Sequence, residues 1–133
     1  MEKVSSKMLV GEVTPRIQGL QTLLDKNLPI KVAYKLGKIV NALADEAKAY
    51  EEARIKLGNQ LSNKDSEGNP VIKDGAFDLT PEARLQFEKD HAELFMLEVE
   101  VTAPVISLEE FKDIEASARE LLLLGDFLVE EQE

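Results

Sequence analysis

The chain has 133 residues, of which 44% are hydrophobic and 32% are charged, and it carries a net charge of −10 and no cysteine. This composition is typical of one globular domain with a modest core, and it excludes disulfide bonds, thiolate chemistry and zinc sites built on Cys. Because affinity for nucleic acid depends on Lys and Arg neutralising phosphates, the negative charge predicts no direct nucleic acid binding.

The negative charge leaves three interpretations open. It can simply keep the protein dissolved, form a surface that meets a basic partner, or mimic the charge of a nucleic-acid backbone. No apolar run approaches the length of a membrane span, and Met1–Lys7 lacks the basic start and apolar centre of a signal peptide. We therefore expect a cytoplasmic protein that has no contact with membranes.

The first segment, Ser5–Lys26, is predicted to be helical but interrupted. Thr14 has the side chain of a helix N-cap, and Pro15 then occupies the first helical position, where its missing N–H costs nothing. A stripe of apolar residues follows at helical spacing: Ile17, Leu20, Leu23 and Leu24. Asn27–Pro29 ends this helix and starts the next, so the two helices should form an antiparallel hairpin.

The second segment, Pro29–Leu61, is predicted to be one long amphipathic helix. Its apolar residues recur every three or four positions: Val32, Leu36, Ile39, Val40, Leu43, Ala47, Tyr50, Leu57 and Leu61. At about 1.5 Å per residue, such a helix is about 50 Å long, which exceeds what a compact domain of this size requires. Part of the helix should therefore project or contact another subunit, which predicts a homo-oligomer.

Positive charge gathers where a helix tolerates it least. Lys31, Lys35 and Lys38 form a stripe on the first turns of this helix, where they oppose the helix dipole. Free backbone N–H groups at a helix start favour phosphates, the lysines would add charge, and Tyr34 could stack on a base. We predict that Lys31, Tyr34, Lys35 and Lys38 bind a partner or a small anionic, nucleotide-like ligand. The alternative is that they form the solvated face of an amphipathic helix.

Residues 63–80 form the turn region. A two-residue loop, Asp74-Gly75, lies between two short apolar runs, which is typical of a β-hairpin. The region also has residues near the spacing of a calcium-binding loop: Asn63, Asp65, Glu67, Gly68 and Asp74. The match is degenerate, because Asn replaces the first Asp of the pattern and Asp replaces its final Glu. We therefore interpret this segment as a solvated turn and predict no metal site.

The last third of the chain should contain a helix, a strand and two short helices. Thr80-Pro81 supplies an N-cap and a first helical residue for a helix that runs to about Leu97. Residues 98–103 alternate strictly between polar and apolar side chains, which predicts a half-buried strand. Two capping boxes, Ser107–Glu110 and Ser117–Glu120, predict the two short C-terminal helices.

The chain has no recognisable catalytic pattern. Glu88 and His91 form a Glu-x-x-His motif of the kind that di-iron bundles use twice, but His91 is the only histidine. It also lacks a Ser or Cys partner in a nucleophile motif, and the sequence has no Gly-rich phosphate loop. We therefore predict a protein that is not an enzyme and has no cofactor, with His91 as an ordinary, partly buried or surface residue of a helix.

Five segments carry a family resemblance: Leu28–Lys38, Tyr50–Arg54, Asp65–Asn69, Leu94–Val101 and Ile106–Leu108. Together they resemble a family of uncharacterised small accessory proteins of tailed phages that infect Gram-positive bacteria. The resemblance spans the chain from residue 28 to about residue 128, with loose motifs and no catalytic signature. It implies a phage origin and an accessory role in the host cell.

These observations predict an α+β, mostly α fold: a long helical hairpin with a small antiparallel sheet and short C-terminal helices. We expect one domain over residues 1–133, with the helical hairpin at 5–62, the turn region at 63–80, and the remaining helix, strand and short helices at 81–129. The expected function is that of a non-enzymatic phage accessory protein that acts by binding. It would be a host-directed, counter-defence inhibitor that engages a host or phage protein or sequesters a small phosphorylated signal. The alternative is a minor virion or assembly protein that oligomerises through the long helix.

Overall fold

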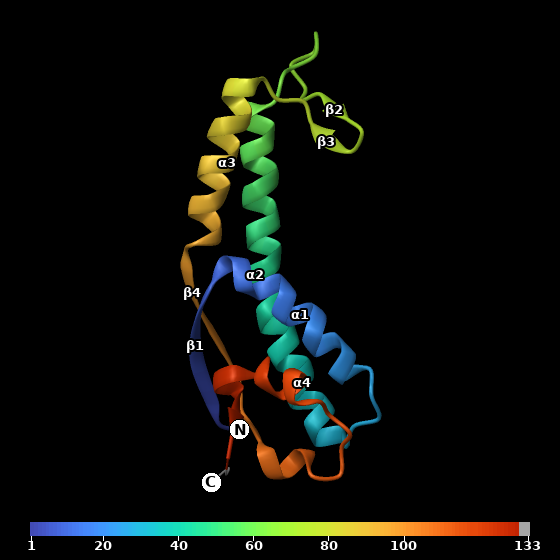
Figure 1. Ribbon diagram of the computed structural model, residues 1–133. Helices are drawn as coiled ribbons and strands as arrows, with labels where there is room; N and C mark the ends of the chain where they lie inside the picture. Colours follow the sequence, from blue (N-terminus) through green and yellow to red (C-terminus); the bar gives the residue numbers. More distant parts are fainter. Residues whose placement is uncertain (131–133) are drawn as a thin grey trace.

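The protein is elongated around one long helix. A computed structural model describes residues 1–130, and Figure 1 shows α2 (Ile30–Leu61) running through most of the length of the molecule. Helices make up 57% of the structure and strands 18%, which confirms a mostly α, α+β fold. The first half of α2 lies in a compact base, formed by residues 1–43 and 98–130. Its second half lies in an arm, formed by residues 44–97.

A two-stranded antiparallel sheet forms one side of the base. β1 (Lys3–Leu9) pairs with β4 (Glu98–Pro104) along its whole length, from Lys3 opposite Pro104 to Leu9 opposite Glu98. The strand predicted at residues 98–103 is therefore confirmed, and it continues by one residue. Its partner strand was not predicted, because the sequence pattern assigns that segment to a helix.

The expectation of an interrupted helix over Ser5–Lys26 is wrong. Residues 3–9 form β1, and α1 (Val10–Leu24) begins directly after it. Thr14 is therefore not an N-cap, and Pro15 lies inside the helix instead of at its first position. The helix starts earlier because Val10 and the strand before it pack into the base. This tertiary packing overrides the local signal for a helix start at Thr14.

One polar residue makes β1 difficult to recognise as a strand from its sequence. Ser6 occupies an inward position and is only 3% exposed, so the inward side of the strand does not have a continuous apolar row. A buried hydroxyl needs a hydrogen-bond partner, and Ser6 Oγ donates to Asp126 Oδ2 at 2.9 Å. Because Asp126 lies near the other end of the chain, a local pattern could not reveal that Ser6 is compatible with a buried position.

The hydrophobic core lies between α1, the first half of α2 and the β1–β4 sheet. It is filled by side chains that are at most 2% exposed: Leu20, Leu23, Leu36, Ile39, Leu43, Val101, Ile106, Leu124 and Phe127. α1 contacts α2 and runs in the opposite direction, as the short connection predicts (Figure 1). Each buried side chain of this size contributes about 1.5–3 kcal/mol, and these contacts anchor the first half of α2.

The C-terminal part of the base consists of short elements. In chain order they are β5 (Ile106–Ser107), the 3₁₀ helix η1 (Leu108–Phe111), α4 (Ala118–Leu122), the 3₁₀ helix η2 (Gly125–Phe127) and β6 (Leu128–Val129). Both predicted capping boxes are present, Ser107 with Glu110 and Ser117 with Glu120. The first one starts a 3₁₀ turn where an α-helix was expected. β5 and β6 pair in parallel, so the strands form three separate pairs instead of one antiparallel sheet.

Glu120 ties α4 to α1, and we predict that this contact makes the stability of the fold depend on acid. Its carboxylate accepts hydrogen bonds from the Ser117 N–H, Lys26 Nζ and the Thr22 hydroxyl, each at 3.0 Å. The bond from the Ser117 N–H, followed by the bond from Lys26, lowers the pKa of Glu120 from 4.5 to about 2. A carboxyl whose pKa falls on folding stabilises the native state above its unfolded pKa, and this contribution is lost as the pH falls toward the folded pKa.

Glu120→Gln should therefore lower the melting temperature at pH 7 and flatten its decline between pH 4.5 and pH 2. Thermal melts of the variant and the wild type across this range measure the effect. Glu115→Gln is the matched control, because Glu115 is an exposed acid in the turn just before the Ser117 cap. A decline as steep in Glu120→Gln as in the wild type would contradict the assignment.

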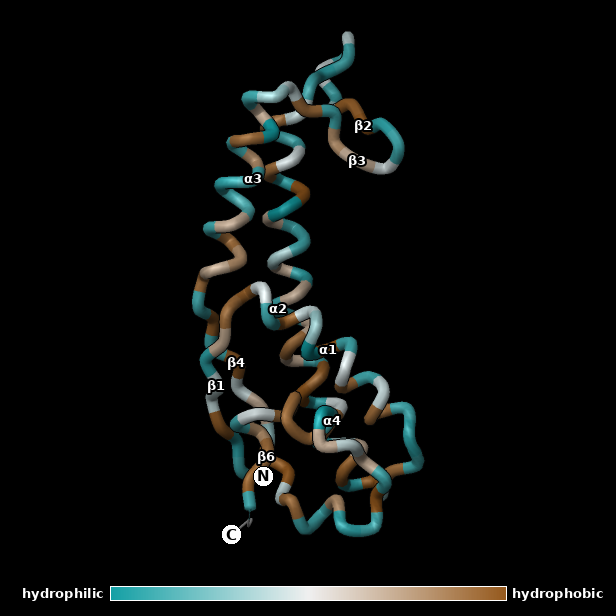
Figure 2. Tube along the Cα trace, in the orientation of Figure 1, coloured by the Kyte–Doolittle hydropathy of each residue, from teal (hydrophilic) through white to brown (hydrophobic). Residues whose placement is uncertain are grey.

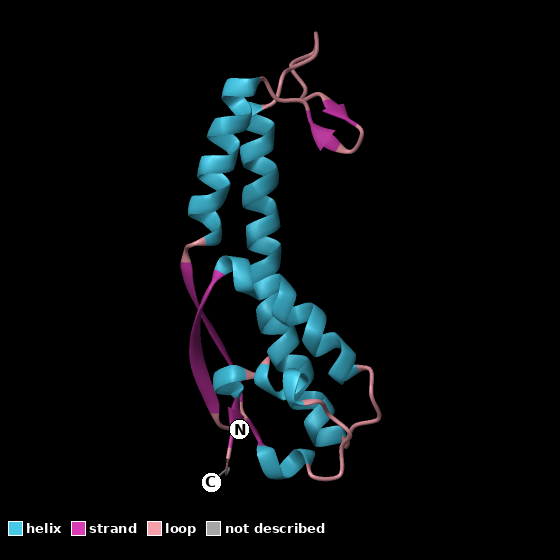
Figure 3. Ribbon diagram, viewed as in Figure 1, coloured by secondary structure: helices cyan, strands magenta, loops and turns pink. Residues whose placement is uncertain are grey.

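The arm consists of two helices and a hairpin at its tip (Figure 3). α3 (Pro81–Phe95) begins as predicted at Thr80, whose hydroxyl oxygen accepts the Ala83 N–H at 3.1 Å. It ends two residues before the predicted Leu97. α3 lies beside the second half of α2 and runs back toward the base.

The predicted hairpin is confirmed. β2 (Ile72–Lys73) and β3 (Ala76–Phe77) are antiparallel and are joined by Asp74 and Gly75. Both turn residues have positive φ, 51° for Asp74 and 78° for Gly75, as a two-residue hairpin turn of this kind requires.

Candidate binding site

The structure divides the predicted binding stripe. Lys31 and Lys38 are exposed, Tyr34 has 55% of its surface exposed, and Lys38 Nζ lies 5.5 Å from the centre of the Tyr34 ring. Lys35, by contrast, is only 1% exposed. The fold therefore brings Tyr34 and Lys38 together at the surface and places Lys35 in the interior of the base.

Lys35 forms a structural ion pair inside the base. Its Nζ lies 3.1 Å from Glu110 Oε1, and Glu110 also accepts the Ser107 N–H at 2.8 Å. Burial acts to raise the pKa of Glu110, but the bonds from Ser107 and Lys35 outweigh it and hold that pKa below its ordinary value. The ion pair joins the first turns of α2 to η1. One of the three lysines is therefore explained by a structural contact.

The surface beside Tyr34 and Lys38 is a shallow depression with a volume of about 390 Å³. It is also lined by Lys3 and Asp45, whereas Lys31 does not contribute to it. The two lysines would attract an anion and Asp45 would repel it, so the charge here is mixed. Binding at Lys31, Tyr34 and Lys38 stays a prediction.

Aromatic side chains join the two helices of the arm. Tyr50 on α2 contacts His91 and Phe95 on α3, and the Tyr50 hydroxyl lies 2.7 Å from His91 Nε2. The ring of Phe87 stacks on that of His91, with the centres 5.7 Å apart. His91 is thus a half-buried helix residue whose imidazole belongs to the contact between α2 and α3.

The other side of α3 has no packing partner among the described residues. No residue of α3 is fully buried. Leu85 and the C-cap residue Met96, 69% and 67% exposed, lie on one side of the helix with Ala92 between them, and the charged residues Glu88 and Lys89 separate Leu85 from Ala92 on that side. In Figure 2, apolar segments recur along α3 and mark β2 at the tip. We call Leu85, Ala92 and Met96 the α3 stripe. Exposed apolar residues grouped in this way are typical of an interaction surface.

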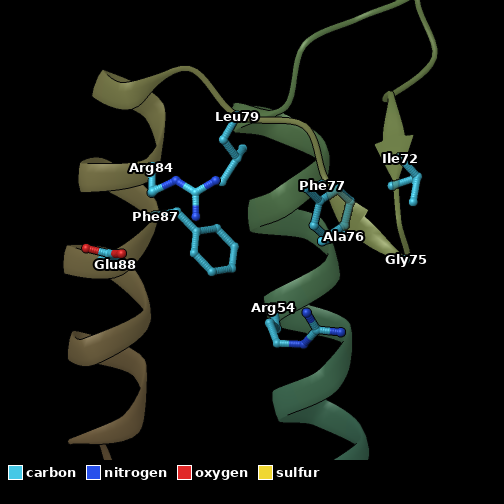
Figure 4. A pocket seen from close by; sticks show the side chains of 9 residues that line it. All are labelled: Arg54, Ile72, Gly75, Ala76, Phe77, Leu79, Arg84, Phe87 and Glu88. Atoms are coloured by element: carbon cyan, nitrogen blue, oxygen red, sulfur yellow. The ribbon is translucent and has the colours of Figure 1, made fainter.

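A pocket of about 440 Å³ lies at the tip of the arm, between α2, α3 and the hairpin (Figure 4). Its apolar walls come from Ile72, Phe77, Leu79 and Phe87. Arg54 on α2 and Arg84 on α3 supply two positive charges, and Glu88 supplies a negative charge. In Figure 4 the Arg84 guanidinium reaches into the gap between the helices, whereas the Arg54 guanidinium points from α2 toward the side away from α3. We call this the tip pocket, and its volume is that of a small-molecule site.

Gly58 makes room for one wall of the tip pocket. A Cβ atom at this position would lie 2.1 Å from the Phe77 ring, so the ring can rest on α2 only because position 58 is glycine. The hairpin is also fixed to the end of α2, because the Asn63 N–H donates to the Asp78 carbonyl at 2.8 Å. The sequence therefore builds this wall in a defined place.

Sequence reasoning missed the tip pocket. Its residues come from α2, the hairpin and α3, and no motif links them. The available signal was indirect: a hairpin predicted between the end of a long helix and the capped start of the next must lie close to both.

The Asp65 carboxylate stabilises the turn that follows it. Asp65 Oδ1 accepts the N–H groups of Glu67 and Asn69 at 2.9 and 3.0 Å, in agreement with the interpretation as a turn. No group of three or more His, Asp or Glu side chains within residues 1–130 is placed to hold a metal ion. Over the same range, no helix combines the length and the apolar character that crossing a membrane requires.

Comparison with protein-family models, with curated proteins and with solved structures finds no match for this chain.

Proposed function

We propose that this chain is a non-enzymatic binding protein that engages another protein through the α3 stripe. The observation that carries the proposal is that α3 buries none of its residues, while Leu85, Ala92 and Met96 leave apolar side chains exposed on one side of it. Two helices alone do not enclose a core, so the arm gains from a third surface placed against it. Covering Leu85 and Met96 would contribute about 1.5–3 kcal/mol for each side chain.

In this proposal the protein works in the cytoplasm of a bacterial host as a phage accessory protein. The resemblance carried by Leu28–Lys38 and the four later segments supports the phage origin. The partner is a host protein, as for a counter-defence inhibitor, or another phage protein.

The alternative is a minor virion or assembly protein, in which the partner is a second copy of the chain. The length of α2 favours it, because only the first half of this helix of 32 residues is anchored in the base. The two proposals use the same surface and differ in what covers it.

A single cysteine can separate the two proposals, because the chain has none of its own. Leu85→Cys is labelled with a thiol-reactive photocrosslinker and irradiated as purified protein and in a lysate of Gram-positive host cells. A protein binder should give one adduct in the lysate that forms again with the purified partner, and the assembly protein should give an adduct of twice the chain mass when irradiated alone. Gln18→Cys, on the exposed side of α1, is the matched control.

The α3 stripe has no binding role if Leu85→Cys gives no more adducts than Gln18→Cys in either sample. Met96→Glu provides a second measurement. Because Met96 is 67% exposed, this change should leave the melting temperature unchanged while abolishing any adduct formed at position 85.

A further inference from the structure

We propose that the tip pocket binds a nucleoside monophosphate. The site is distinct from the α3 stripe, and the proposal does not depend on the protein partner proposed above. The tip pocket combines aromatic walls with two guanidinium groups. This combination suits a ligand that joins a flat base to a phosphate group.

The aromatic walls are held in place before a ligand arrives. Gly58 seats the Phe77 ring on α2, and Phe87 lies nearly parallel to His91, at an angle of 8° between the ring planes. Side chains that are already ordered lose little conformational freedom on binding. Phenyl rings stack on every kind of base, because each base has a π-face, so they favour a nucleobase without selecting one.

Arg84 is the phosphate contact. None of the four ion pairs among residues 1–130 involves it. Figure 4 shows its guanidinium extending from α3 toward α2, next to Leu79 and Phe87. A guanidinium offers two parallel N–H groups to a phosphate, and this charge-assisted pair is stronger than a neutral hydrogen bond.

Arg54, on the α2 side of the tip pocket, already has a partner. Its Nε donates to Glu51 at 3.1 Å, and its Nη2 donates to the other carboxylate oxygen of Glu51. This ion pair with Glu51 offsets the charge of Arg54, so the phosphate contact is assigned to Arg84 alone. With Glu51 and Glu88 counted beside the two arginines, the charges around the tip pocket balance, and the attraction for a phosphate comes locally from the Arg84 guanidinium in the gap between the helices.

The charge of the whole protein selects a free nucleotide over a nucleic acid strand. A strand would bring many phosphates against a chain with a net charge of −10, and its binding would require many basic contacts. A nucleoside monophosphate has a single phosphate, for which the Arg84 guanidinium is sufficient, and a volume of about 440 Å³ is adequate for the ligand.

Titration of the protein with AMP tests the proposal. Binding is measured by calorimetry and by the amide NMR shifts of the isotope-labelled protein. Adenosine lacks the phosphate and ribose 5-phosphate lacks the base, so each should bind at least about tenfold more weakly than AMP. Arg84→Gln should weaken AMP binding by about tenfold to a hundredfold. Lys89→Gln is the matched control, because it removes one positive charge from an exposed position on the same helix and should leave AMP binding unchanged.

Several results would overturn the proposal. They are equal binding of adenosine and AMP, an unchanged affinity in Arg84→Gln, an equal loss in Lys89→Gln, and no response to millimolar AMP or GMP. The NMR shifts also locate the ligand. Changes at Ile72, Phe77 and Phe87 support the tip pocket, whereas changes confined to Tyr34 and Lys38 would place the anion at the depression on the base.

Discussion

Lys35→Glu should be the most damaging single change in the stripe formed by Lys31, Lys35 and Lys38. Lys35 is 1% exposed and its Nζ lies 3.1 Å from Glu110 Oε1, so the new carboxylate would be buried next to the partly exposed carboxylate of Glu110. An uncompensated buried charge costs about 3–5 kcal/mol. This is a large part of the stability of an ordinary domain, so we expect the melting temperature to fall by about 10 °C or more at pH 7.

Lys31→Glu and Lys38→Glu are the matched controls, because they make the same charge change at exposed positions of the same helix. Lys31→Glu should be neutral or slightly stabilising, since acids suit the first turn of a helix, and Lys38→Glu should be close to neutral because its side chain is solvated. Thermal melts should also show that the deficit of Lys35→Glu relative to the wild type is smaller at pH 4, where protonation relieves the repulsion. If Lys35→Glu fails to fold, Lys35→Met should fold with an intermediate loss. Equal effects at all three positions would contradict the structural role of Lys35.

Gly58→Ala should release the hairpin from the arm without unfolding the protein. The added Cβ would lie 2.1 Å from the Phe77 ring, so the ring must leave α2 and the β2–β3 hairpin must move with it. The helix itself should gain up to about 1 kcal/mol, because alanine is a better helix former than glycine. We therefore expect rapid proteolysis within residues 63–78 and loss of AMP binding, with a melting temperature close to that of the wild type.

Gly37→Ala is the control for this change. Gly37 also lies inside α2, but a Cβ there has nothing within 4 Å. This variant should gain the same helix stabilisation and keep a protease-resistant hairpin. A hairpin that stays intact in Gly58→Ala would contradict the account of the pocket wall.

The sequence predicts those elements whose signals are local. The long helix follows from its apolar period, the start of α3 from Thr80-Pro81, the hairpin from Asp74-Gly75, and the C-terminal turns from their capping boxes. In each case neighbouring residues supply the hydrogen bonds or the backbone angles that define the element. The boundaries are less accurate, as at the end of α3, because tertiary contacts decide where a helix stops.

The features that escaped prediction depend on partners far away in the chain. β1 needs Asp126 to satisfy Ser6, and the burial of Lys35 needs Glu110. The local pattern of three lysines suggests one surface, yet Glu110 draws the middle lysine inward. The tip pocket likewise exists only when the hairpin folds back onto Gly58. Sequence patterns describe faces and turns, but they do not say which distant residue will meet them.

The continuity of α2 between base and arm affects how the protein unfolds locally. Starting a helix is unfavourable and extending it is not, so the anchored half of α2 acts as the nucleus from which the arm propagates. The arm lacks a core of its own, and its distal turns should therefore fray and re-form while the base stays closed. Protection of amide hydrogens from exchange should then rise steadily from residue 61 toward residue 43 along a single helix. Any partner or ligand that binds the arm would shift this local equilibrium further toward the folded form, so the protection of the arm's amide hydrogens should rise on binding.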